Sequence, residues 1–153
     1  KVKNLIIILL LILSSCSLNA DQEASLHQAM VSYVNSRNNG VVMSYVGYTH
    51  PNIVAHYKVQ GDSLFQAYFD VSNEEERPFF QDGIIQTIES EGDIIHVKYE
   101  FQKYEYFEFM NESKKAIIFA ITENSGKSWF FAEEDEYYNE KIIPKNKRLI
   151  KRS

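Results

Sequence analysis

The sequence predicts an α+β domain in which several helices come first and a curved antiparallel sheet follows. Up to Pro78 the apolar residues recur at the three- and four-residue spacing of helices, and after it they alternate with a period of two. The ten Tyr, ten Phe and one Trp favour a sheet that packs its face on a core. With 153 residues the chain is long enough to fill one such core, so we expect one domain.

The first half of the chain is predicted to form three or four helices in succession. The first begins at Ala24 and ends at Asn38, because its apolar residues follow the i, i+3, i+4 spacing and Gly40 suits the position just past a helix end. The second spans Val41 to Tyr48 and stops where Thr49-His50-Pro51 interrupts the pattern.

The third and fourth predicted helices follow Pro51 and Gly61. Pro51 suits the first turn of a helix that runs to Tyr57, with one of the two preceding residues near its N-cap. Gly61 ends this helix, and the amphipathic pattern of the fourth continues into the charged residues 73–77. We interpret the three glutamates there as a solvated helix end.

Four strands are predicted after Pro78, over residues 84–88, 94–102, 116–122 and 128–133. The second alternates, which places Ile95 on the core side and predicts a solvated His96. Since the apolar phase breaks after it, we expect a bulge or a bend near residues 102–104. The third strand is apolar on both faces, as a central strand requires, and Gly126 is expected at positive φ in the hairpin that follows.

The N-terminal stretch resembles a bacterial lipoprotein signal. Lys1 and Lys3 precede nine apolar residues, and Leu13-Ser14-Ser15-Cys16 then has the pattern of a lipobox. The resemblance implies that residues 1–15 are removed and that Cys16 carries lipid, with residues 16–23 forming the lipidated cysteine and a tether. It implies a lipid-anchored protein of the bacterial cell envelope, on the inner or the outer membrane.

The sequence favours two alternatives to a lipidated leader less strongly. A transmembrane anchor needs about 20 apolar residues, whereas this run has nine. An ordinary cleaved leader, with Ser15 or Ala20 before the cut, would leave the position of the lone Cys16 to chance.

Two stretches of the remaining chain resemble the nuclear transport factor 2-like (SnoaL-like) α+β cone. They are the helix break Tyr48-Thr49-His50-Pro51-Asn52-Ile53-Val54 and the final hairpin over residues 120–131. The resemblance implies a domain over residues 24–145, followed by a basic tail over residues 146–153, and a cavity between the helices and the concave face of the sheet. Because this superfamily includes isomerases, dehydratases and binding modules, the fold alone implies no function.

Composition excludes several classes of function. The formal net charge of −5 does not favour nucleic acid as a partner. The single Cys16 allows no disulfide within the chain and no cysteine metal site, and the four histidines are scattered. No metal site and no cofactor are therefore expected.

The function expected first is that of a non-enzymatic module, anchored to the membrane through Cys16, which binds a small apolar ligand or another envelope protein. The oligomeric state is left open, with a dimer as one option. Ligand-binding candidates are aromatic residues, although packing into the core is the default for such side chains: Tyr48, Tyr99, Phe101 and Trp129.

The alternative is a cofactor-independent enzyme of the isomerase or dehydratase type. By analogy with such relatives, it would need a carboxylate or histidine base and a tyrosine or acid that holds a developing oxyanion. The eligible residues are His50, His56, Tyr99 and Glu105. For His50, capping of the helix that follows is the competing structural role.

The C-terminal end of the chain is basic, with five cations between Lys145 and Arg152, whereas the chain as a whole is acidic. Contact with anionic lipid headgroups is one expectation for these cations. A frayed, solvated terminus and neutralisation of the acidic residues 133–140 are the alternatives.

Overall fold

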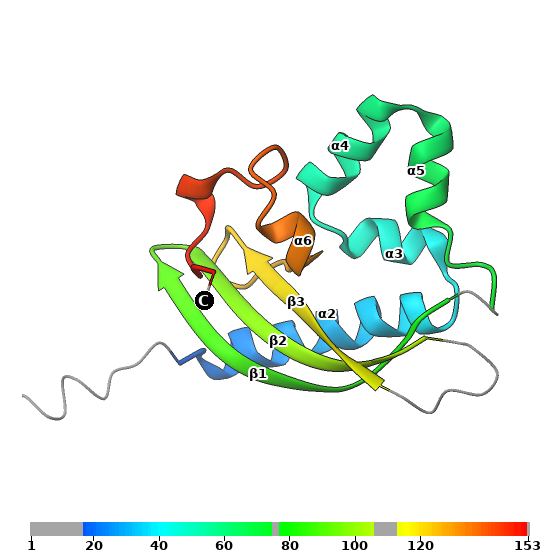
Figure 1. The fold of residues 1–153 in the computed structure, drawn as a ribbon. Helices are drawn as coiled ribbons and strands as arrows, with labels where there is room; N and C mark the ends of the chain where they lie inside the picture. Colours follow the sequence, from blue (N-terminus) through cyan, green and yellow to red (C-terminus); the bar gives the residue numbers. More distant parts are fainter. Residues whose placement is uncertain (1–16, 75–76, 106–112, 153) are drawn as a thin grey trace, which may run out of the picture.

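The computed structural model describes residues 17–74, 77–105 and 113–152, so the lipobox lies outside the described residues. Helices α2 (Ala20–Asn38), α3 (Val42–Tyr48), α4 (Pro51–Gln60) and α5 (Asp62–Phe69) come first (Figure 1). Strands β1 (Phe79–Glu91), β2 (Ile94–Tyr104), β3 (Ser113–Thr122) and β4 (Phe130–Glu133) follow, and then the short helix α6 (Glu134–Tyr137) and the 3₁₀ turn η1 (Lys145–Lys147). The predicted α+β fold is confirmed.

The strands form one curved antiparallel sheet in the order β1-β2-β3-β4, along which α2 lies (Figure 1). This arrangement is compatible with a cone-like domain. Among the residues described, no helix combines the length and the apolar character that crossing a bilayer requires.

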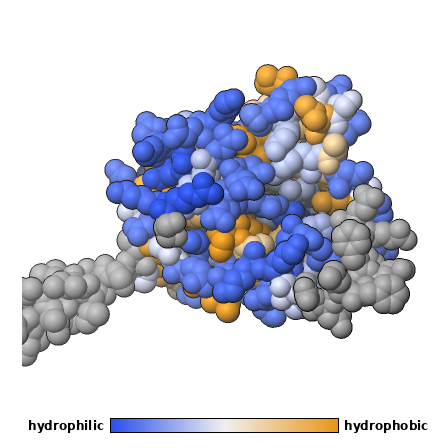
Figure 2. All heavy atoms as spheres, in the orientation of Figure 1, coloured by the Kyte–Doolittle hydropathy of each residue, from blue (hydrophilic) through white to orange (hydrophobic). Residues whose placement is uncertain are grey.

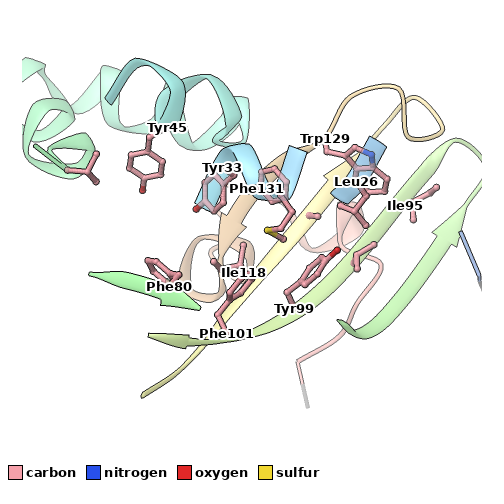
Figure 3. Close-up of a cluster of buried hydrophobic side chains, with 14 of the residues drawn as sticks. Leu26, Tyr33, Tyr45, Phe80, Ile95, Tyr99, Phe101, Ile118, Trp129 and Phe131 are labelled. Atoms are coloured by element: carbon pink, nitrogen blue, oxygen red, sulfur yellow. The ribbon is translucent and has the colours of Figure 1, made fainter. Parts of the chain in front are cut away.

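A large hydrophobic cluster fills the space between the helices and one face of the sheet. Figure 3 shows its side chains meeting from α2, α3 and all four strands or their flanks. The ring of Tyr33 stacks on that of Phe131 with centroids 4.6 Å apart, and the ring of Tyr45 meets that of Phe69 edge-on at 5.2 Å. This face of the domain is closed by aromatic packing.

A second cluster covers the opposite face of the sheet. Phe119 and Ile121 of β3 pack there against Tyr137 of α6 and against Ile143 and Ile150 of the C-terminal segment. The rings of Phe119 and Tyr137 are stacked with centroids 3.7 Å apart. The C-terminal segment is therefore a structural layer of the domain, which the sequence did not predict.

A buried ion pair joins α2 to the end of β4. Arg37 is only 6% exposed, and its Nη1 atom lies 2.6 Å from Oε1 of Glu133. The guanidinium also lies over the rings of Tyr45 and Phe80, at 4.9 and 4.4 Å from their centroids. Because a buried cation is tolerated only with such partners, this pair fixes the register of α2 on the sheet.

Helix α2 begins four residues before the predicted start. The side chain of Asn19 accepts a hydrogen bond from the backbone N–H of Gln22, whose own side chain accepts from Asn19 N–H, which is a capping box. The predicted end at Asn38 is confirmed, with Gly40 at a φ of 70°.

Helix α5 is shorter than predicted, because it ends at Phe69 and does not reach residues 73–77. The carboxylate of Asp70 accepts hydrogen bonds from the N–H and the hydroxyl of Ser72, which turns the chain. Val71 is then buried in the main cluster. Glu74 is therefore not a helix end, and residues 75–76 lie outside the described part.

Of the bulge or bend expected near residues 102–104 of β2, the bulge is wrong, since β2 pairs with β3 without a break from Ile95 to Tyr104. Two irregularities lie instead in the edge strand β1, between Gln81 and Ile84 and between Ile85 and Thr87. At the first, Gly83 leaves room for the ring of Phe101, which any Cβ would overlap. Such extra residues curve an edge strand and protect it from pairing with other chains.

The predicted positive φ of Gly126 is confirmed at 85°, and a Cβ there would lie 2.9 Å from Cγ of Gln22. We expect Gly126→Ala to lower the free energy of unfolding by about 1–2 kcal/mol, because the substitution adds backbone strain and a contact with α2. Gly47→Ala is the control, since a Cβ at this helical position meets nothing within 4 Å. Equal denaturation midpoints for the two variants would contradict the assignment.

Candidate functional site

The predicted ligand-binding aromatics mainly form the core. Phe101 and Trp129 are 4% and 3% exposed, and Tyr48 packs against the main cluster from its edge. Tyr99 is 7% exposed, and burial raises the pKa of its phenol to about 12, so the hydroxyl stays neutral. Tyr99 and Phe101 both line a groove of about 250 Å³ beside α2, and Tyr99 also lines a second groove of about 490 Å³ beside the start of that helix.

The four catalytic candidates lie in different surroundings. His56 is on the exposed side of α4 with its ring against the side chain of Gln60. Glu105 is exposed and pairs with Nζ of Lys114 at 3.0 Å, an interaction that lowers the pKa of its carboxyl. Tyr99 lies beneath α2, whereas His50 lies beside the second cluster. The structure thus brings His50 together with none of the other three candidates in one pocket.

His50 instead shares a pocket with His96, a residue that the sequence predicted to be solvated. The pocket has a volume of about 260 Å³ and lies where the start of α4, the ends of β2 and β3, and the C-terminal segment meet. Its lining is completed by one amide, three apolar residues and two ions: Asn52, Ile121, Ile143, Pro144, Glu123 and Lys147. We call it the two-histidine pocket.

His50 is held in the pocket by the start of α4. Its backbone N–H donates to the carbonyl of Phe131 at 2.9 Å, which ties the segment before Pro51 to β4. Its Nδ1 atom accepts a hydrogen bond from the N–H of Asn52 at 3.2 Å, so the ring caps the helix as predicted. The side chain of His50 therefore both caps α4 and lines the pocket.

His96 is 2% exposed, so its predicted solvation is wrong. The cause is the C-terminal segment, which covers the face of β2 that the alternating pattern assigned to solvent. Nδ1 of His96 lies 2.6 Å from the hydroxyl of Tyr137 and accepts from the N–H of Leu149 at 3.4 Å. The hydroxyl of Tyr137 accepts from the N–H of Ile150, and because Nδ1 of His96 is the acceptor for Leu149 N–H, the hydroxyl proton is the donor in the contact with His96.

Both histidines are neutral hydrogen-bond donors toward the pocket. Burial lowers the pKa of His50, and burial together with the nearby His50 lowers the pKa of His96 to about 4. Since Nδ1 of each ring already accepts a hydrogen bond, the single proton of each neutral ring is on Nε2. From the described residues no hydrogen bond reaches either Nε2 atom.

This arrangement favours an anion over a metal ion. A metal bound at Nε2 would require protonated Nδ1 atoms, which would then face the backbone N–H groups that now donate to them. Within residues 17–74, 77–105 and 113–152 no three His, Cys, Asp or Glu side chains are grouped as metal ligands. A neutral ring with its proton on Nε2 offers a hydrogen-bond donor, and an anionic oxygen is the acceptor that suits such donors.

Comparisons with protein-family models, with curated proteins and with solved structures find no significant match to this chain. Any statement about the two-histidine pocket therefore rests on its own geometry. The sequence signal for His50 was its place before Pro51, whereas no local signal marked His96, because the cover that buries it comes from residues about 50 positions later.

The burial of His96 predicts a pH dependence of stability. Its pKa is lowered from 6.5 to about 4 in the folded protein, so between these values the unfolded chain binds a proton that the folded one does not. The contribution of neutral His96 to the free energy of unfolding is complete above pH 6.5 and is lost as the pH falls toward 4. The free energy of unfolding decreases over this range by up to about 3 kcal/mol.

His96→Gln removes this titration and keeps an oxygen that can accept from Tyr137. Denaturant unfolding of both proteins at a series of pH values measures the difference, in which groups common to both cancel. The advantage of the wild type over the variant should shrink between pH 6.5 and 4. A difference independent of pH would show that His96 titrates normally.

Proposed function

We propose that this chain is a lipid-anchored binding protein of the bacterial cell envelope, whose two-histidine pocket takes a small monocarboxylate. The observation that carries the ligand assignment is that the largely buried rings of His50 and His96 line one open pocket, and that no hydrogen bond from the described residues reaches either Nε2 atom. The space in which an enzyme of the cone type would hold its substrate is filled here by aromatic side chains, which favours a binding role over the isomerase or dehydratase alternative.

The walls and the rim of the pocket narrow the class of ligand. Ile121, Ile143 and Pro144 give it apolar walls, which suit a short aliphatic body. At the rim Lys147 attracts an anion, whereas Glu123 opposes a second negative charge. A monocarboxylate is thus favoured over a phosphate, and the pocket volume of about 260 Å³ limits the ligand to a small molecule.

The resemblance to the nuclear transport factor 2-like cone is part of the proposal. It is supported by the order of helices and strands, by the helix break at Pro51 and by the hairpin at Gly126. If this resemblance is correct, the two-histidine pocket of this chain lies outside the cavity between the helices and the concave face of the sheet, where the superfamily would bind its ligands.

The anchor is tested at Cys16. Lipid attached to this cysteine would hold the protein at the membrane, because each buried methylene contributes about 0.8 kcal/mol. We expect the full chain expressed in a bacterial host to incorporate labelled fatty acid and to sediment with membranes, and Cys16→Ser to do neither. A Cys16→Ser protein that still carries label and still sediments with membranes would refute lipidation at this residue.

The ligand assignment is tested with propionate, and with phosphate at the same ionic strength as the competing anion. Propionate should shift the ring resonances of His50 and His96 with one common dissociation constant, and it should bind more tightly than phosphate. His50→Asn keeps a cap for α4 but lacks the Nε2–H donor, so the affinity should fall about tenfold, the value of one hydrogen bond to a charged group.

The control pair for this test is in η1. Lys147→Gln should weaken propionate binding about two- to fivefold, whereas Lys145→Gln should not, because only Lys147 lines the pocket. Propionate shifts that do not saturate, or that are the same in His50→Asn and the wild type, would refute the assignment.

A further inference from the structure

The basic end of the chain is folded onto the domain. Nε of Arg148 donates to the carbonyl of Ile143 at 2.9 Å, and the N–H of Ile150 donates to the hydroxyl of Tyr137 at 3.2 Å. Ile150 is 6% exposed and belongs to the second hydrophobic cluster. For these residues the alternative of a frayed, solvated terminus is therefore wrong.

This folding gathers cations around a second pocket of about 490 Å³, separate from the two-histidine pocket. Its polar lining includes four cations, Lys145, Arg148, Lys151 and Arg152, and one acid, Glu140. Figure 2 shows a strongly hydrophilic band over the C-terminal segment, at the left of the molecule. The excess of positive charge makes this basic pocket a site for an anion.

Arg148 carries an unsatisfied donor at this pocket. Its side chain is 11% exposed, and its Nη2 atom is buried and has no hydrogen-bond partner in the described part of the chain. The nearest acid, Glu140, is 3.9 Å away, beyond hydrogen-bond distance, and its own side chain is 70% exposed. Arg148 is therefore a largely buried cation whose charge is only weakly countered by Glu140, and it adds to the positive charge of the other lining cations.

The arginines are also held in position by an aromatic ring. The guanidinium carbons of Arg148 and Arg152 lie 5.9 and 5.3 Å from the ring centroid of Tyr138. Two guanidinium groups that share one ring lose less freedom on binding than two free side chains would. Such paired arginines bind phosphate oxygens well, since each offers several N–H donors in a fixed plane.

We propose that the basic pocket holds the phosphate group of an anionic phospholipid headgroup, a role that rests on the membrane anchoring proposed at Cys16. The choice of a lipid over a free phosphate comes from the position of the pocket.

The start of α2 is linked by hydrogen bonds to the end of the sheet at which the basic segment lies. The side chain of Gln22 near the start of α2 donates to the carbonyl of Ser125, and the N–H of Ser125 donates to the carbonyl of Asp93.

From Asp93 the chain leads within three residues to His96, which accepts from the N–H of Leu149. The start of α2 and the basic segment therefore flank the same end of the sheet, and both lie at the left in Figure 1. A lipid on Cys16, shortly before α2, would hold this end of the domain toward the membrane surface. There each cation near anionic headgroups adds attraction.

The test uses the chain that starts at Ser17, which contains both hydrophobic clusters and lacks Cys16, so a failure of lipidation cannot affect it. This protein should bind vesicles of phosphatidylcholine with phosphatidylglycerol and not vesicles of phosphatidylcholine alone. Arg152→Gln should weaken binding about fivefold, as expected for one cation at an anionic surface, and Glu140→Gln should strengthen it.

Lys147→Gln is the matched control, because Lys147 is a cation of the same segment that lines the two-histidine pocket instead. It should weaken vesicle binding less than Arg152→Gln, whereas for propionate the order of the two variants should reverse. Equal losses from both variants on vesicles would mean diffuse attraction and would overturn the pocket. Binding of inorganic phosphate that Arg152→Gln weakens, without binding to the anionic vesicles, would overturn the lipid assignment.

Discussion

The burial of β3 on both faces is the constraint on which the rest of the structure depends. Ile118 and Ala120 point into the main cluster, and Phe119 and Ile121 point into the second. A strand with apolar side chains on both sides must be covered twice. Helix α2 and its neighbours provide one cover, and the segment from α6 to Ile150 provides the other. Both proposed pockets lie along this second cover, where the C-terminal segment meets the sheet.

Features of the fold that depend on local chemistry were predictable from the sequence. Gly40 after α2 and Gly126 in the last hairpin have a positive φ, which glycine adopts most readily, and the ring of Pro51 presets the φ of the first turn of α4. The change of period after Pro78 likewise located the sheet, because alternation along a strand follows from backbone geometry.

Features that depend on distant partners were not predictable in this way. The alternation in β2 assigned His96 to solvent because polar residues usually mark an exposed face, and only the later C-terminal segment reverses that assignment. Nothing in the helical pattern around Arg37 marks it as buried, yet Glu133 and two aromatic rings surround it. His50 was a candidate site residue because it precedes Pro51, but His96, which lines the same pocket, was not among the candidates.

The second cover also links stability to the chemistry of the two-histidine pocket. The segment that shields His96 from water keeps its ring neutral, and Tyr137 and Leu149 direct the remaining proton to Nε2. A more open His96 would be better hydrated and would be free to bind its proton on either nitrogen, and it would lose its fixed donor geometry. The packing of Ile143 and Ile150 on β3 therefore defines the donor pattern of the pocket as well as the core.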